Sequence, residues 1–422
     1  MKKYMIMAYI VLAFSLSANA QDLSLSTCID SAVANMPALQ QSDGIKNSLA
    51  NKIKSYEALN LPTLNLNGQI TYQSAVPELP FSIPNMPGLE IPQTQFRSYL
   101  EVSQPIYNGG VSKALKGAET ASSIAQIAQL NISALALKKQ VTELYFNILE
   151  IQSQSEILDE TILLLTEKQG VLEAAFENGV AQQNDLLKLK SQLLTLNNQQ
   201  QLIDKKAASA IDILEILCGF PISENQQLIP TESNFSVSTD LKNNPELMYL
   251  SASATALESK VDVIKTQRMP KVVAFGQGGF GQPNPLNIFE ADVAGYYMLG
   301  AKLQWKITDW GNTARDLQNI EIGTEQLGLM QQQKSIELNS KITQLLADID
   351  VLDLTILNDI QVIELQKQIV KNAKTQYDQG IITFTEYMDE ELVLKQAEIG
   401  LSTHKTQKEK AEHLLQLEIG NL

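Results

Sequence analysis

The sequence predicts a mixed α and transmembrane β protein in which one structural unit occurs twice. Three observations carry this prediction. Landmark residues recur at constant offsets, four segments alternate apolar and polar residues with the period of a β-strand, and two runs of about 65 residues carry apolar heptads. A period of two followed by a heptad period within one repeat indicates paired strands that lead into long helices.

The duplication shows as two series of matched residues. An offset of 208 relates Asn35-Met36-Pro37 to Asn243-Asn244-Pro245, Leu61-Pro62 to Met269-Pro270, and Gly68 to Gly276. An offset of 201 relates Gly110 to Gly311, Gly179 to Gly380, and Gly219 to Gly420. We therefore divide the chain into a first repeat at 21–219, a connector at 220–240 and a second repeat at 241–422.

The N-terminus, residues 1–20, is typical of a signal peptide. Two lysines precede an apolar run that is too short to span a bilayer comfortably, and Ala18-Asn19-Ala20 forms a cleavage site. The residue directly after this site is Gln21 and not a cysteine, so we expect no lipid anchor. The formal net charge of −15 argues against a nucleic-acid partner. The sequence thus predicts an exported protein.

Each repeat is expected to begin with a helix followed by two strands. In the first repeat the helix covers 26–60 and stops before Pro62. The strands follow at about 62–74 and 96–107, separated by a proline-rich loop, and the first strand has one apolar face, formed by Leu64, Leu66, Ile70 and Tyr72.

The second repeat shows the same order less clearly. We expect a helix at 241–268 and strands at about 270–281 and 296–308. The second of these strands alternates strongly. The first is weaker, because Val273 and Phe275 stand where the other repeat has Asn65 and Asn67. All four strands are long enough to cross a bilayer when tilted.

Long helices are predicted at 110–175 and 311–376, each followed by a glycine turn and a return helix at 184–218 or 384–418. Apolar residues hold the a and d heptad positions, among them Val141, Leu144, Ile148, Ile342, Leu345 and Ile349. At 1.5 Å per residue a long helix reaches about 100 Å, and the return helix covers only about half of that. The helix before the strands can cover the rest, which places the connector at a waist.

The cysteines Cys28 and Cys218 leave two alternatives open. They could pair in an oxidising compartment, or remain two buried thiols, which we favour.

Strands in a membrane need partners from other chains. Open sheet edges cannot face lipid, and four strands are too few to close a barrel, since the smallest transmembrane barrels use eight. A pore-forming oligomer with a helical stalk is what the residues support.

The duplicated layout, the joins QPIYNGG and WKITDWG, and the tips FENGVAQQNDLL and YDQGIITFTEYMDEE together resemble the TolC-like outer-membrane efflux proteins, the outer membrane factors. The resemblance covers essentially the whole mature chain. It implies a homotrimer whose strands complete a shared trimeric 12-stranded β-barrel in the outer membrane. It also implies an α-helical coiled-coil barrel in the periplasm, which docks onto a periplasmic adaptor (membrane fusion protein) and an inner-membrane transporter.

The resemblance also assigns roles at the tips and joins. Gly110 and Gly311 mark the strand-to-helix joins, and adaptor hairpins dock at Gly179, Val180, Gly380 and Ile381. Glu386 and Asp389 would line the channel constriction, where rings of acids attract cations. The alternative is that these acids only stabilise the N-terminus of the return helix, with Thr383 or Thr385 as its N-cap. Lys188 follows Asp185 in the first repeat, so the constriction should come mainly from the second.

Other classes of site find no support. GQGGFG at 276–281 matches a dinucleotide pattern, but Pro283 and Pro285 exclude the helix that would receive a pyrophosphate. His404 and His413 are too far apart on one helix to share a metal. We expect no cofactor, no metal and no enzymatic activity. The remaining functional alternative is an exported coiled-coil spacer or adhesin, and the transported substrate (drug, metal or protein) stays open.

Overall fold

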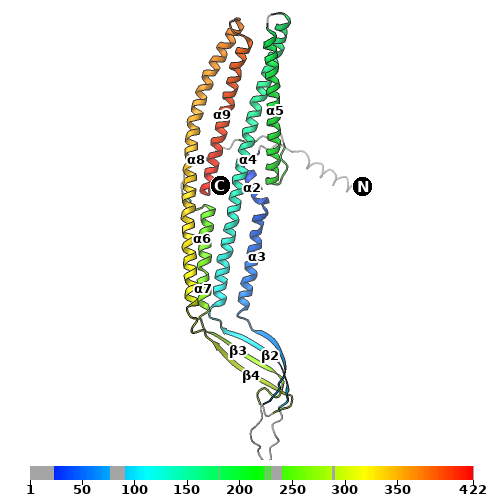
Figure 1. Ribbon diagram of the computed structural model, residues 1–422, viewed down its shortest axis with the longest axis vertical. Coiled ribbons are helices and arrows are strands. Elements are labelled where there is room, and N and C mark those ends of the chain that lie inside the picture. Colours follow the sequence, from blue (N-terminus) through cyan, green and yellow to red (C-terminus); the bar gives the residue numbers. More distant parts are fainter. Residues whose placement is uncertain are drawn as a thin grey trace, which may run out of the picture. The chain divides into compact units, whose positions relative to one another are not determined.

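A computed structural model describes residues 23–76, 91–179, 181–223, 226, 228–229, 240–287 and 290–421 (Figure 1). The predicted signal peptide and most of the predicted connector lie outside these residues. The chain forms two compact units, one within Met1–Gln41, Gln129–Met248 and Gln333–Leu422, the other within Ser42–Ala128 and Tyr249–Gln332. Each unit therefore draws on segments of both repeats.

One antiparallel sheet contains all four predicted strands, in the order β1-β2-β3-β4. The first repeat supplies β1, Thr63–Tyr72, and β2, Thr94–Tyr107, and the second supplies β3, Lys271–Gln282, and β4, Ala294–Gln304. The two hairpins have the same register. Leu64 lies opposite Val102 in the first hairpin, and their counterparts at offsets 208 and 201, Val272 and Leu303, lie opposite each other in the second.

The register sorts the side chains onto two faces, because directly opposed residues share a face. We define the apolar face by the large side chains Leu64, Leu66, Ile70, Tyr72, Leu100, Val102, Phe280, Tyr297, Leu299 and Leu303. The polar face carries Asn65, Asn67, Gln69, Arg97, Glu101, Gln277 and Lys302. The apolar face is exposed to a degree unusual for a folded chain, with Leu66 74% and Leu299 78% exposed.

Strand β3 forms despite its weak alternation, and its glycines let neighbouring groups approach closely. A Cβ atom on Gly279 would lie 2.1 Å from the Ser98 carbonyl oxygen, and one on Gly300 in β4 would lie 2.8 Å from the ring of Phe275. The segment GQGGFG is therefore strand rather than a phosphate-binding turn.

The prediction that the fourth strand extends to residue 308 is wrong for the single chain, since β4 ends at Gln304. Gln304 lies opposite Lys271, the first residue of β3, so the following residues have no strand to pair with. The Trp305 indole instead donates a hydrogen bond to the Arg268 carbonyl at 3.0 Å.

The predicted helix at 26–60 is two helices, α2, Leu25–Asn35, and α3, Pro37–Ala58. Pro37 fits the first turn of a helix, but it pushes the preceding Met36 out of helical geometry, to ψ 112°. In the second repeat the predicted helix at 241–268 starts later and is also divided, into α6, Pro245–Glu258, and α7, Lys260–Thr266.

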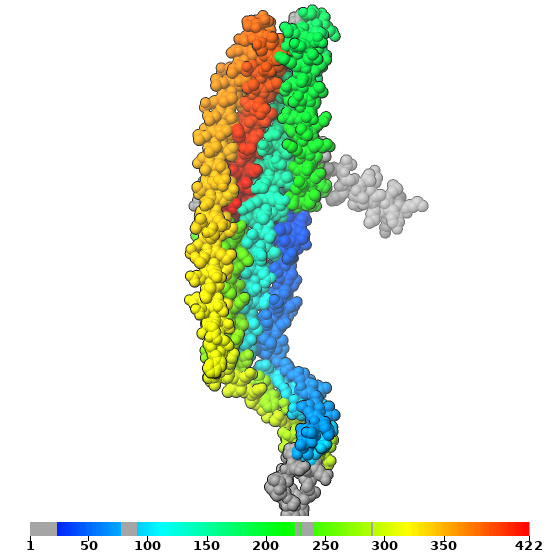
Figure 2. Space-filling model, in the orientation of Figure 1, coloured from blue at the N-terminus to red at the C-terminus, as the bar shows by residue number. Residues whose placement is uncertain are grey.

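The long helices are α4, Val111–Glu177, and α8, Asn312–Asp378, and their return helices are α5, Gln183–Cys218, and α9, Phe384–Ile419. Within the first unit α5 (green) lies along α4 and α9 (red) along α8 (Figures 1 and 2). The heptad residues are core: Val141 and Ile148 are fully buried, and Ile342, Leu345 and Ile349 nearly so. None of the helices in the described ranges combines the length and apolar character needed to cross a bilayer.

The N-terminal segment is fastened to α4 by one buried tyrosine. The Tyr145 hydroxyl lies 2.6 Å from the Leu23 carbonyl oxygen and accepts a hydrogen bond from the Ile229 N–H at 3.1 Å. Cys28 and Cys218 lie in the same core, both free and both fully buried. The structure thus has the unpaired arrangement that the sequence favoured.

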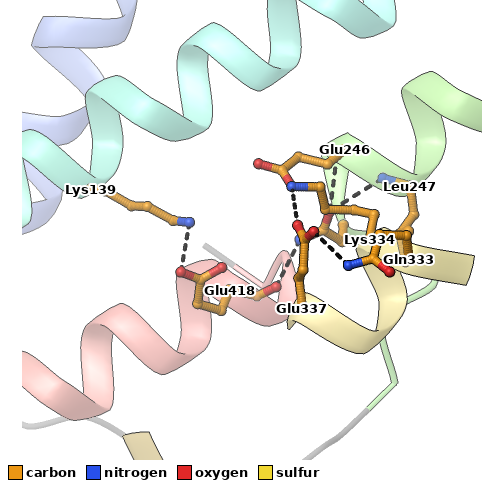
Figure 3. Close-up of polar contacts among 8 residues, drawn as sticks. Lys139, Glu246, Leu247, Gln333, Lys334, Glu337 and Glu418 are labelled. Atoms are coloured by element: carbon orange, nitrogen blue, oxygen red, sulfur yellow. Dashed lines mark hydrogen bonds and ion pairs between the residues drawn. The ribbon is translucent and has the colours of Figure 1, made fainter. Parts of the chain in front are cut away.

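A buried asparagine joins the end of α9 to the start of α6. Asn244 donates to the Glu418 carbonyl at 2.9 Å, and its side-chain oxygen accepts from the N–H groups of Glu246 and Leu247 at 2.9 and 3.3 Å. Figure 3 shows two ion pairs made by Glu418 and Glu246, Lys139 with Glu418 at 2.8 Å and Lys334 with Glu246 at 3.2 Å. In the first repeat the Asn35 side chain, at the end of α2, donates a hydrogen bond to the Cys218 carbonyl at the end of α5.

Candidate functional site

Both tips reverse the chain through a glycine in the left-handed region. Gly179 has φ +73° and Gly380 φ +71°, and nothing lies within 4 Å of the place where either Cβ would be. Backbone conformation is therefore the reason for glycine at these positions. The N–H groups of Gly179 and Gly380 donate to the carbonyls of Phe176 and Tyr377, both at 2.9 Å, so the two turns are alike.

Two of the four predicted docking residues are the turn glycines themselves, Gly179 and Gly380. Ile381 is 66% exposed, an apolar side chain presented at the second tip. Val180 lies outside the described residues.

The return helix of the second tip begins with a capping box. The Thr383 hydroxyl accepts from the Glu386 N–H at 3.3 Å, and the Glu386 carboxylate accepts from the Thr383 N–H at 2.7 Å. The hydrogen bonds from the Thr383 backbone and hydroxyl, together with nearby Lys188, lower the pKa of the Glu386 carboxyl. Glu386 thus has the cap-type geometry that was one of the two alternatives.

The first tip lacks this cap. Gln182 stands at its N-cap position without a side-chain hydrogen bond. Its acid, Asp185, instead accepts a hydrogen bond from the Thr385 hydroxyl at 2.8 Å, which links the two tips within the chain. Sequence reasoning considered Thr385 only as a cap, and nothing in the spacing signals a contact across 200 residues.

Glu386 and Asp389 are both exposed on α9, whereas Tyr387 and Met388 between them are buried. Asp389 also lines a cavity of about 360 Å³ between α5 and α9, together with Asp185 and Lys188. This cavity therefore carries two acids and one base in a single chain, beside apolar walls formed by Leu165, Leu189, Phe384 and Leu392.

An aromatic cluster stiffens the second tip. The Tyr377 ring stacks on Tyr387 at 5.8 Å and meets Phe384 edge-on at 5.6 Å. The Tyr387 hydroxyl donates to Glu391 at 2.6 Å. Burial raises the pKa of both tyrosines, so they stay neutral donors. The aromatic spacing was visible in the sequence but was not interpreted as a cluster.

The strand-to-helix joins repeat one design. Gly110 and Gly311 both have φ +81°. Asn108 accepts from the Gly110 N–H, and its counterpart Asp309 accepts from the Gly311 N–H, both at 3.0 Å. Asp309 also accepts from the Thr313 N–H at 2.9 Å and from the Thr313 hydroxyl. These bonds lower the pKa of Asp309 to about 2.

Neither histidine belongs to a metal-binding group in the part of the chain that the structure describes. His404 pairs with Asp359 at 2.6 Å, and His413 contacts the Glu409 carbonyl and the Phe146 ring. Across the described ranges no three His, Cys, Asp or Glu side chains gather as metal ligands would.

Comparison with known proteins identifies the class. Residues 28–216 match the family model described as outer membrane efflux protein. The first repeat therefore belongs to this family, and the resemblance to TolC-like efflux proteins is confirmed. No curated protein sequence matches the chain significantly.

Solved outer-membrane proteins share the fold of the whole chain. CusC, whose structures concern transmembrane channel formation, is 18% identical with a TM-score of 0.74, covering 97% of this chain and 96% of that one. VceC of Vibrio cholerae is 14% identical (TM-score 0.68, 94% and 96% covered), and the CmeC channel of Campylobacter jejuni is 17% identical (0.69, 94% and 85%). Residues 28–216 thus match the outer membrane efflux protein family, and the chain has the fold of these outer-membrane channels.

Proposed function

We propose that the chain is the outer-membrane exit duct of a tripartite efflux or type I secretion system. Three chains pool their strands into one barrel, and substrates reach the duct from an inner-membrane pump through a periplasmic adaptor. The observation that carries this proposal is the sheet. Its apolar face is exposed over all four strands, and β1 and β4 each leave one edge unpaired within the chain. Lipid would cover the apolar face, and strands of neighbouring chains would pair with the two open edges.

An exported coiled-coil spacer would leave this face and these edges without a role. The heptads alone are compatible with such a spacer, but the sheet is not.

At the far end of the duct we assign Glu386 and Asp389 to the constriction and the tip residues Gly179, Val180, Gly380 and Ile381 to adaptor docking. Support comes from the exposure of both acids on one side of α9 and from the exposed apolar Ile381. Two acids from each of three chains would form a ring that admits cations and holds off anions. The capping role of Glu386 is compatible with this, because one carboxylate oxygen remains for the lumen.

Single-channel recording in planar bilayers tests the proposal. The wild-type protein should give a small, cation-selective conductance. The double substitution Glu386→Gln/Asp389→Asn should raise the conductance or abolish the selectivity, while glutamine at position 386 retains a capping side chain.

Two variants serve as matched controls. Thr383→Ala removes the cap and keeps both charges, and Asp378→Asn removes one acid from the tip outside the constriction; neither should change ion selectivity. A double variant with unchanged conductance and unchanged ion selectivity would refute the constriction. Folded, oligomeric protein without any conductance would refute the duct.

A further inference from the structure

The charged residues of the sheet all lie on one of its two faces. The four strands contain Arg97, Glu101, Lys271 and Lys302 as their charged residues. The strand register places all four on the polar face. Three cations and one anion leave a net charge of +2 on this face, in a chain whose formal net charge is −15. The polar face is therefore opposite in sign to the chain as a whole.

The acid on this face is held by neutral neighbours, so it does not neutralise the cations directly. The Glu101 carboxylate accepts a hydrogen bond from the Gln277 amide at 2.5 Å and another from the Ser103 hydroxyl at 3.0 Å. Within the described ranges of the chain, no carboxylate forms an ion pair with any of the three cations, and both lysines are exposed. Their charges thus face whatever fills the space in front of the sheet.

Lys271 and Lys302 form a pair near one end of the sheet. Lys271 begins β3 and lies opposite Gln304, while Lys302 lies opposite Val273, so the two lysines are diagonal neighbours on one face. Such neighbours are about 7–8 Å apart, which is within the Debye length of about 10 Å at 0.1 M salt, and their charges therefore act together. This end of the sheet leads to α7 and α8 (Figure 1).

The lysine pair does not follow from the repeat pattern. The counterparts of Lys271 and Lys302 in the first repeat, at offsets 208 and 201, are Thr63 and Glu101. Like charges on neighbouring strands weaken the pairing of those strands. A purely structural role therefore does not account for the pair.

We propose that Lys271 and Lys302 form an anion-binding site in the lumen of the barrel, for the carboxylate, phosphate or sulfonate groups of molecules inside it. This inference rests on the proposed duct, in which the apolar face meets lipid and the polar face lines water. Three chains bring six of these lysines to the lumen, and sets of lysine or arginine line pores that select anions and phosphate. Arg97, near the opposite end of the same face, extends the cationic lining.

The proposed anion site differs in charge and in place from the constriction assigned to Glu386 and Asp389. Those acids lie on α9, in the other compact unit. The narrowest segment of a pore sets its selectivity for small ions, so measurements with small ions report on the constriction. A polyvalent anion reports on the lysines instead, because its attraction to them grows with its charge.

Single-channel recording with tripolyphosphate as the probe tests the anion site. In about 0.1 M potassium chloride, tripolyphosphate added to both sides of the bilayer should block the wild-type current reversibly. The block should weaken strongly in about 1 M salt, where the Debye length shrinks to about 3 Å. The double substitution Lys271→Gln/Lys302→Gln should raise the half-blocking concentration at least about tenfold, because the attraction of a polyvalent anion falls with each charge removed.

The matched control is Lys271→Arg/Lys302→Arg, which keeps both charges and should keep the half-blocking concentration of the wild-type protein. Light scattering of the detergent-solubilised samples checks that each variant is oligomeric. Equal block in the wild-type protein and the glutamine variant, or a conducting wild-type channel without block, would overturn the anion site and leave the duct intact. Folded, oligomeric wild-type protein without any conductance would overturn the duct itself.

Discussion

Replacing Asn244 with leucine should destabilise the helical unit, because this one side chain serves two helix ends. It is fully buried, caps the start of α6 and donates to the Glu418 carbonyl near the end of α9. Leucine has a similar size, so the change removes hydrogen bonds and leaves no large cavity.

The expected loss of stability is the sum of two contributions of Asn244, the cap of α6 and the hydrogen bond to the Glu418 carbonyl. Loss of an N-cap costs about 1 kcal/mol. A buried carbonyl left without a donor costs a further ~2 kcal/mol. The free energy of unfolding should therefore fall by about 3 kcal/mol. Asn244→Ser keeps a capping oxygen but cannot reach Glu418, and it should cost about 2 kcal/mol from the carbonyl alone.

Equilibrium urea unfolding of the detergent-solubilised protein, followed by the helical circular dichroism signal, measures these differences. Asn339→Ala is the control, because Asn339 is exposed on α8 and bonds only within its own helix turn. The reasoning is refuted if Asn244→Leu costs no more than this control. If serine and leucine at position 244 cost the same, the cap contributes nothing.

Three further predictions concern other positions. Tyr145→Phe should lower the free energy of unfolding by about 2 kcal/mol in the same urea assay, because the Leu23 carbonyl and the Ile229 N–H lose the buried hydroxyl to which they bond. Because the pKa of Asp309 is depressed, its carboxylate stabilises the join fully above about pH 4, and this stability is lost as the pH falls through about 2. Tryptophan fluorescence should show this acid transition in the wild-type protein and not in Asp309→Asn. Gly300→Ala should displace the Phe275 ring, which lies on the polar face, away from the sheet and reduce single-channel conductance, and Phe275→Ala in the same chain should restore it.

Most of the architecture could be predicted from the periodic patterns of apolar residues and from the glycines and prolines at the ends of helices and strands. The strands followed from alternation, the tips and joins from glycines, and the heptad residues such as Val141 are the core. The predicted end of β4 was wrong because the alternation of apolar and polar residues indicates only which face of a sheet each residue would take. A strand also needs a neighbouring strand to pair with. The break at Pro37 was missed because proline fits a helix start as well as a helix end.

At the candidate site the sequence identified positions but not contacts. Glu386 and Asp389 could be placed on one side of a helix from their spacing. The bond between Asp185 and Thr385 joins residues 200 apart, and no local pattern encodes such a contact. The Asn244 bridge was missed for the same reason, although Asn244 had been noted as a landmark of the repeat.

The duplicated hairpin also bears on how such a chain arises and assembles. One repeat of about 200 residues already contains a hairpin with both edges and a full tip. In the proposed duct, six separate copies of such a unit could close the ring, so fusing them in pairs would reduce the number of bodies that must meet from six to three. Fusion also frees the two copies to diverge. The second tip has a capped helix and a pair of acids, whereas the first has no side-chain cap and is joined to the second by a hydrogen bond.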